Sequence, residues 1–198
     1  MAIIVDKVQK RKDIALSCKE IFFQNGINGL TISQIAKTAG VGKGTIYEYF
    51  KNKEDIIFEI VNVLIYERNL IVEKQLSSVK TTKEKIKLFS KFFYSDEDLE
   101  MRQLYKEFIS VSLSNPDREM IEFQSACSMD YFNWFEQLIE SGVKNGELIA
   151  GSQKFSRGLF ALSEGIFIKS QVTNLYDDVE EEIHKFIDAL FELIEVKK

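Results

Sequence analysis

The sequence is poor in the residues that interrupt helices. It has one proline, Pro116, and its ten glycines fall into two groups, within residues 26–44 and 142–165. Residues 55–114 contain neither glycine nor proline, and their apolar residues recur at steps of three and four rather than alternating. A sheet-based fold is therefore disfavoured, and the sequence predicts an all-α protein.

Cysteine and histidine are equally scarce. The two cysteines, Cys18 and Cys127, lie far apart without metal-ligand spacing, which argues against a disulfide or zinc site and for a reducing, cytoplasmic setting. The only histidine, His184, lies among charged residues, and we expect it at the surface. No glycine-rich phosphate loop follows a strand. We expect no enzyme, metal or cofactor, and redox sensing through a cysteine is left as an alternative.

Long hydrophobic runs are also missing. No apolar run approaches the roughly 18 to 20 residues of a membrane span, and the run over residues 2–5 is too short for a signal peptide. Yet 45% of the 198 residues are hydrophobic, enough for the core of one large or two small domains. We expect a protein without a membrane partner.

Charge is divided unevenly along the chain. Residues 1–53 carry nine Lys/Arg against four Asp/Glu, whereas the remainder carries seventeen against twenty-seven. Attraction to phosphates acts over about 10 Å, so a local basic region matters more than the overall pI of about 5.2. An ordinary solvated face is the alternative. We place a basic domain at residues 1–53 and an acidic one at 54–198.

Three helices are expected in the basic domain, at residues 6–25, 32–39 and 43–50, with Gly26 ending the first. The second and third are short and are joined by a glycine-containing turn, which is the pattern of a helix-turn-helix.

Local signals support this pattern. Thr31 and Gln34 have the spacing of a capping box, and Asn52 is placed to cap a fourth helix with Asp55 in its first turn. Ala36 and Gly40 are small, so we expect them to let the two short helices approach closely.

The 43–50 helix has two distinct faces. Steps of 100° place Ile46 and Phe50 on one side, and Gly44, Thr45 and Glu48 on the other. The first side suits burial, and the second offers a small polar surface that fits the major groove of DNA. An ordinary amphipathic helix would have a similar pattern.

The segment from residue 29 to 57 reads GLTISQIAKTAGVGKGTIYEYFKNKEDII. It closely resembles the DNA-binding motif of TetR-family transcriptional regulators in both residues and spacing. The remaining sequence matches that family only in length and helical plan. Gly42 departs from the family, which often has serine there as the helix cap.

The resemblance implies roles for individual residues in DNA binding. Phosphate contacts are implied for Thr31, Ser33, Tyr47, Tyr49 and Lys53. Lys43, Gly44 and Thr45 would lie deepest in the groove. Glu48, which should repel phosphate, can accept a hydrogen bond from the N4 amine of cytosine, so we expect it to select a base.

The acidic domain is expected to form a larger bundle, giving about nine helices in all. Its helices are predicted at residues 57–77, 83–94, 98–114, 117–144, 152–174 and 179–196. Aromatic and sulfur-containing residues favour an apolar ligand site, with core packing as the alternative. The candidate ligand-binding residues are Phe92, Met101, Tyr105, Phe108, Phe123, Cys127, Tyr131 and Trp134.

The last two helices have wide apolar stripes, and similar helices form the homodimer interface in the family. The candidate interface residues are Leu159, Leu162, Ile166, Ile183, Ile187, Leu190 and Ile194. These features predict a ligand-responsive regulator, most simply a repressor, that binds a near-palindromic DNA operator as a homodimer. A small apolar or aromatic effector of unknown identity would release it. The alternative is a constitutive or architectural DNA-binding protein without a small ligand.

Overall fold

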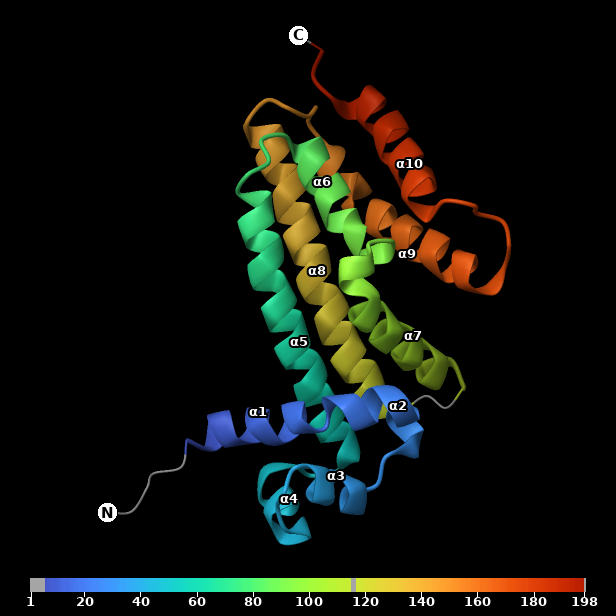
Figure 1. Cartoon of the computed structure of the whole chain (residues 1–198). Coiled ribbons are helices and arrows are strands. Elements are labelled where there is room, and N and C mark those ends of the chain that lie inside the picture. Colours follow the sequence, from blue (N-terminus) through green and yellow to red (C-terminus); the bar gives the residue numbers. More distant parts are fainter. Residues whose placement is uncertain (1–5, 115–116, 198) are drawn as a thin grey trace. The chain divides into compact units, whose positions relative to one another are not determined.

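The chain is helical throughout the part that the computed structural model describes, residues 6–114 and 117–197 (Figure 1). Ten α-helices and three short 3-10 helices follow one another in these residues, and no strand occurs among them. The all-α prediction is confirmed. The short apolar run over residues 2–5 lies outside the described part. None of the described helices combines the length and the apolarity that a membrane span requires.

The extra helix arises because the first predicted helix is divided in two. The structure has α1 over Lys7–Ser17 and α2 over Lys19–Gly29, separated at Cys18. Cys18 has backbone angles of φ −95° and ψ 0°, and its N–H donates to the carbonyl of Ala15 at 3.0 Å, so the α-helical ladder is interrupted there. The prediction of one continuous helix over 6–25 was therefore wrong, although Gly26 does leave the helical conformation, with φ +67°.

The helix-turn-helix follows as predicted. Its two helices are α3 over Ile32–Thr38 and α4 over Lys43–Tyr49, and α5 then runs over Lys53–Leu76. The expected cap of α5 is present, because the Asn52 side-chain oxygen accepts from the Asp55 N–H at 2.8 Å.

Contacts divide the protein into two compact units. Unit 1 comprises the described residues of Met1–Leu70 and Gln103–Phe123, and unit 2 those of Ile71–Arg102 and Gln124–Lys198. The long helices α5, α7 (Leu99–Ser114) and α8 (Arg118–Lys144) each contribute to both units. These units differ from the sequence-based division at residue 53, because unit 1 also contains the first part of α5 and parts of α7 and α8.

Unit 1 has a continuous apolar core. Ile14, Cys18 and Phe22, which lie at helical spacing along α1 and α2, are buried, and Ile21 beside them is partly exposed. The same core contains apolar residues from α3, α4 and α5, namely Ile35, Ile46, Phe50, Ile57 and Ile60. Burial of each such side chain contributes about 1.5–3 kcal/mol, so α3 and α4 owe their stability to packing rather than to length.

Unit 2 is built around α6 (Thr82–Ser90), α9 (Ser156–Val172) and α10 (Val179–Ile194), with α8 alongside. The 3-10 helices are Lys91–Phe93, Asp96–Asp98 and Ser152–Phe155. Asp188 of α10 joins two lysines of α6, at 3.0 Å from Lys83 and 2.7 Å from Lys87.

The helix predicted over 83–94 ends earlier, at Ser90, and continues as a 3-10 turn. Arg102, which is buried, donates to the main-chain carbonyls of Phe92 and Ser95. These carbonyls therefore bond with a side chain instead of continuing the α-helical ladder.

Candidate nucleic-acid interface

The start of α3 is fixed by a complete capping box. The Gln34 N–H donates to the Thr31 hydroxyl at 3.3 Å, and the Thr31 N–H donates to the Gln34 side-chain oxygen at 3.0 Å. The Thr31 hydroxyl also donates its proton to that oxygen at 2.7 Å. Thr31 thus has no second hydroxyl proton to offer, whereas Ser33 beside it is exposed.

The turn between α3 and α4 depends on one left-handed residue. Gly40 has φ +65°, which other residues rarely adopt, and Val41 donates to the carbonyl of Ala36 at 3.0 Å. A methyl group at Gly40 would have no atom within 4 Å. Glycine is therefore needed at position 40 for its left-handed backbone angle. The expectation that its small size allows close helix approach was wrong. Ala36 is buried at the contact.

The faces of α4 agree with the sequence pattern. Ile46 is buried, as is Phe50 just after the helix, whereas Gly44 and Glu48 are exposed on the opposite side of α4. Four further predicted residues occupy this surface or its edges: Lys43 and Tyr47 are exposed, and Thr45 and Tyr49 are partly exposed. Tyr47 exposes 61% of its surface, so its ring and hydroxyl are accessible.

Gly44 has no function within the fold itself. Its φ is not positive, and a methyl group placed on it would have no atom within 4 Å. A glycine inside a helix costs about 0.5–1 kcal/mol relative to alanine. The helix therefore carries an unfavourable residue on its exposed face for no reason that the chain itself supplies.

Gly42 lies at the N-cap of α4 with extended backbone angles, and as a glycine it has no side chain to accept a hydrogen bond from the first turn. Serine would fit there and could cap the helix, as the family resemblance of the sequence indicated.

Lys53, at the first turn of α5, is partly exposed and lies 3.9 Å from Glu54. The predicted phosphate-binding lysine is thus accessible.

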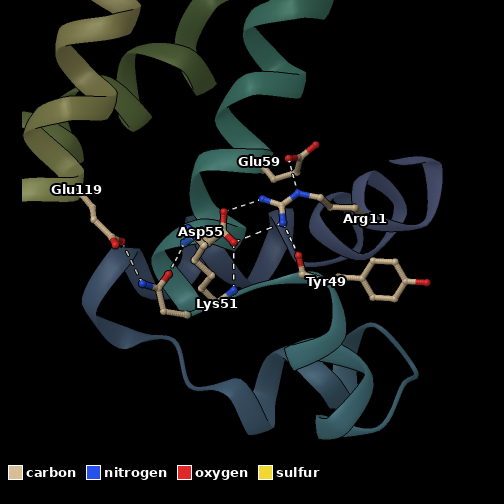
Figure 2. A network of polar contacts seen from close by, with 7 residues as sticks. Arg11, Tyr49, Lys51, Asp55, Glu59 and Glu119 are labelled. Atoms are coloured by element: carbon tan, nitrogen blue, oxygen red, sulfur yellow. Dashed lines mark hydrogen bonds and ion pairs between the residues drawn. The ribbon is translucent and has the colours of Figure 1, made fainter. Parts of the chain in front are cut away.

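A polar network holds the end of α4 against α1 and α5 (Figure 2). Arg11 of α1 donates to the Tyr49 carbonyl, to Asp55 at 2.6 Å and to Glu59 at 2.8 Å. Burial alone would raise the pKa of the Asp55 carboxyl, but hydrogen bonds from Arg11 and from the Lys51 N–H hold that pKa below its ordinary value. Sequence analysis missed this network, because Arg11 lies 38 to 48 residues from its partners.

The candidate ligand residues fall into two separate aromatic clusters. In unit 1, Phe58 stacks on Phe123 with ring centroids 4.4 Å apart and lies 6.3 Å from Phe108. In unit 2, Phe89 stacks on Trp134 at 4.8 Å and meets Tyr131 edge-on at 5.7 Å.

Two residues that the sequence list omitted complete the unit 2 cluster. Phe135 and Phe160 are buried, and Phe89 lies 5.1 Å from the ring of Phe135 and 6.2 Å from that of Phe160. Phe92 instead packs edge-on with Phe93 at 5.1 Å. The other candidates, Met101, Tyr105 and Cys127, are partly exposed.

The two thiols and the histidine are not exposed reactive groups. Burial raises the pKa of the Cys18 thiol, and burial followed by the charge of Asp130 raises that of Cys127. His184 is only partly exposed and lies 3.1 Å from the Tyr94 hydroxyl, whose pKa burial raises to about 12. The expected surface position of the histidine is only partly met, because His184 of α10 lies beside Tyr94.

Most of the candidate dimer residues lie inside unit 2. Leu159, Ile183, Ile187 and Ile194 are fully buried, which disagrees with a role in contacting a second copy. Leu162, Ile166 and Leu190 are partly exposed. One edge of the apolar stripe on each of α9 and α10 lies in the core. Periodicity alone does not show which edge is buried.

The other edge of these stripes is exposed. On α9 it comprises Ala161, Gly165, Ile168 and Val172, which follow steps of three and four. On α10 it comprises Phe186, Ala189 and Leu193, and Leu193 exposes 76% of its surface. We call these seven residues the α9/α10 face.

Comparisons with known proteins agree with this architecture. The family described as "Bacterial regulatory proteins, tetR family" matches residues 18–60, which include the helix-turn-helix. The fatty acid metabolism regulator protein of Bacillus subtilis is 31% identical over 150 residues, covering 73% of this chain and 74% of that protein. The regulator QacR of Staphylococcus aureus is 26% identical over 134 residues, covering 65% and 68%.

Solved structures show the same fold. A TetR-family regulator from Cytophaga hutchinsonii superimposes with a TM-score of 0.79 at 17% identity, over 98% of this chain and 99% of the other. FadR of Bacillus subtilis, solved in complex with stearoyl-CoA, gives a TM-score of 0.57 at 23% identity, over 91% and 95%. These relatives are transcriptional regulators rather than enzymes. This chain, with its helix-turn-helix at α3 and α4, belongs to the TetR family of DNA-binding transcriptional regulators.

Proposed function

We propose that the protein is a ligand-responsive repressor that binds a near-palindromic operator as a homodimer. The observation that carries the proposal is the exposed face of α4, where Gly44 weakens the helix without serving the fold. A bare backbone there lets α4 approach base edges closely, as reading of the major groove requires.

The residues around Gly44 then take distinct roles. Lys43 and Thr45 lie beside it in the groove, and Glu48 accepts from a cytosine amine. Phosphates are bound at the margins by Ser33, Tyr47, Tyr49 and Lys53, with Thr31 acting through its capping of α3. Hydroxyl groups and lysines at helix starts are suited to this role.

A homodimer is consistent with DNA reading by α4. Two copies of α4 must reach successive major grooves, which lie about 34–36 Å apart along the duplex. The α9/α10 face is apolar and exposed in one copy, and a two-fold dimer would cover it with the same face of a second copy. The small residues Ala161 and Gly165 would permit close helix approach.

The effector is proposed to be small and largely apolar. The aromatic cluster around Phe89, Tyr131 and Trp134 supplies the kind of side chain that lines apolar ligand sites. Because a relative of this chain was solved with stearoyl-CoA, whose acyl chain is apolar although its CoA part is large and charged, long-chain fatty acids and their thioesters are the first compounds to test. An effector that favours a form with misplaced DNA-binding helices lowers DNA affinity, and a hundredfold effect needs about 2.7 kcal/mol of differential binding. The site of action would be the cytoplasm.

Selection of bound fragments from a random duplex library tests the proposal. We expect a near-palindromic site, bound with a steep dependence on salt, and release of that site by an acyl thioester. Salt-sensitive binding that no compound reverses would favour the constitutive alternative. Failure to enrich any duplex at low salt would contradict DNA reading altogether.

A further inference from the structure

The Arg11 side chain of α1 bonds to two further elements around the candidate reading helix, α4 and α5. Its guanidinium donates to the Tyr49 carbonyl at the end of α4 and to Asp55 and Glu59 in the first two turns of α5. It also lies over the ring of Phe50, 4.3 Å from the centroid. Figure 2 shows these bonds converging on one side chain of α1.

The bond to Tyr49 meets a requirement of α4. The last carbonyls of a helix have no partner within it, and α4 has only seven residues. A cation at this end also complements the helix dipole. Tyr47 and Tyr49, two proposed phosphate contacts, lie in the same last turn, so Arg11 fixes the segment that carries them.

The bonds to Asp55 fix the connection that follows. The Asp55 carboxylate receives Arg11 through both oxygens, at 2.6 and 3.4 Å, and the Lys51 N–H at 3.1 Å. Asn52 holds the Asp55 N–H at 2.8 Å. The link between α4 and α5 is therefore held by the Asp55 carboxylate at Lys51 and by the Asn52 side chain at the Asp55 N–H, and Arg11 balances the charge of that carboxylate.

A planar guanidinium is needed for this arrangement. It donates in three directions while its face stacks on Phe50, whereas a lysine ammonium is a single point charge on a flexible stem. Arg11, Asp55 and Glu59 expose 28%, 23% and 15% of their side chains, so the pairs are partly shielded from water.

We propose that Arg11 is a positioning residue for DNA reading, which sets the orientation of α4 against α5 and acts on DNA only through α4. The inference rests on the proposed function, since it assigns how that same site is held in place. It predicts that breaking the Arg11 network impairs sequence-specific binding selectively and leaves the general attraction to phosphate intact.

Asp55→Asn is the most informative variant, because general electrostatics predicts tighter DNA binding and loss of positioning predicts weaker binding to the selected duplex. Removal of a negative charge from the basic unit strengthens general phosphate attraction. Loss of a charge-assisted partner of Arg11 loosens α4, and we expect affinity for the selected duplex to fall about tenfold or more. Affinity for a scrambled duplex of equal length should stay equal or rise.

Asp13→Asn is the matched control. Asp13 is exposed on α1 and accepts from Gln9 at 2.8 Å, with no bond to Arg11, so the variant removes the same charge without touching the network. It should bind the selected duplex at least as tightly as the unmodified protein.

Arg11→Lys keeps the charge and should show the same selective loss. Arg118→Lys, at an exposed arginine on α8, controls for the chemical change. If Arg11→Lys does not fold, Asp55→Asn and the milder Glu59→Gln carry the test, each with a thermal melt alongside.

The possible outcomes distinguish a positioning role from loss of folding and from failure of the proposed function. Asp55→Asn binding the selected duplex as tightly as the unmodified protein would overturn the proposal. Equal loss on both duplexes would also overturn it, because that is what a lower folded fraction produces. If the unmodified protein does not distinguish the two duplexes, the proposed function fails, and the positioning role fails with it.

Discussion

Replacement of Gly44 by alanine should separate stability from DNA binding. The added methyl group meets no atom within 4 Å, and the backbone is already helical, so the fold accepts it without strain. Alanine is favoured over glycine by about 0.5–1 kcal/mol in a helix interior, which is an upper bound for the first turn of α4 and corresponds to a rise in Tm of at most about 4 °C for a chain of this size.

The same methyl group should weaken operator binding. If α4 lies in the major groove with its backbone close to the base edges, the methyl group forces it outward and weakens several base contacts together. Each good bidentate base contact is worth about 1–3 kcal/mol, so we expect a loss of at least about tenfold. Binding to a scrambled duplex should not change, because no charge is altered.

Thermal melting and titration by fluorescence anisotropy measure the two effects on one sample. Ser125→Ala is a suitable control, since Ser125 is exposed on α8 and alanine also raises helix propensity there. A Gly44→Ala protein that binds the selected duplex as tightly as the unmodified protein would refute the reasoning, because the glycine would then have no purpose at the DNA.

Three further predictions concern other parts of the molecule. Glu48→Ala should change the preferred base at one position in each half-site when the selection is repeated, and an unchanged ranking of sites would make Glu48 a bystander. Leu193→Glu should convert the protein to folded monomers in light scattering, because it puts a charge on the α9/α10 face at a side chain that is 76% exposed in one copy; a persistent dimer would place the interface elsewhere. The pKa of Asp55 is lowered in the folded state, so its contribution to stability is complete above about pH 4 and is lost as pH falls through the folded-state value. Urea unfolding between pH 5 and 2 should therefore show a steeper loss of stability for the unmodified protein than for Asp55→Asn, and equal slopes would contradict the assigned ion pair.

The helix-turn-helix was predictable because its signals are local. Thr31 and Gln34 lie three residues apart, Gly40 marks the turn, and Ile46 and Phe50 follow one helical period. Each of these features acts within one or two turns of helix, and so it can be read without knowing the rest of the fold.

The Arg11 network and the true exposed face of α9 and α10 were not predictable in this way. Arg11 looks like any charged residue on an amphipathic helix until α1 is packed against α5. Ile187 and Leu193 are both apolar residues on α10, yet one is buried and the other exposed, because only packing decides which edge of a wide stripe faces the core. The break between α1 and α2 likewise has no sequence signal, because Cys18 is neither a glycine nor a proline.

Protection of guanine N7 from dimethyl sulfate on the selected duplex tests the central claim most directly, since that atom lies in the major groove. The account predicts two protected segments centred about 10 base pairs, or a multiple of that spacing, apart and related by the symmetry of the site. Both should weaken together in Gly44→Ala. Protection spread evenly along the duplex, or none in the major groove, would contradict a dimeric reader that uses α4.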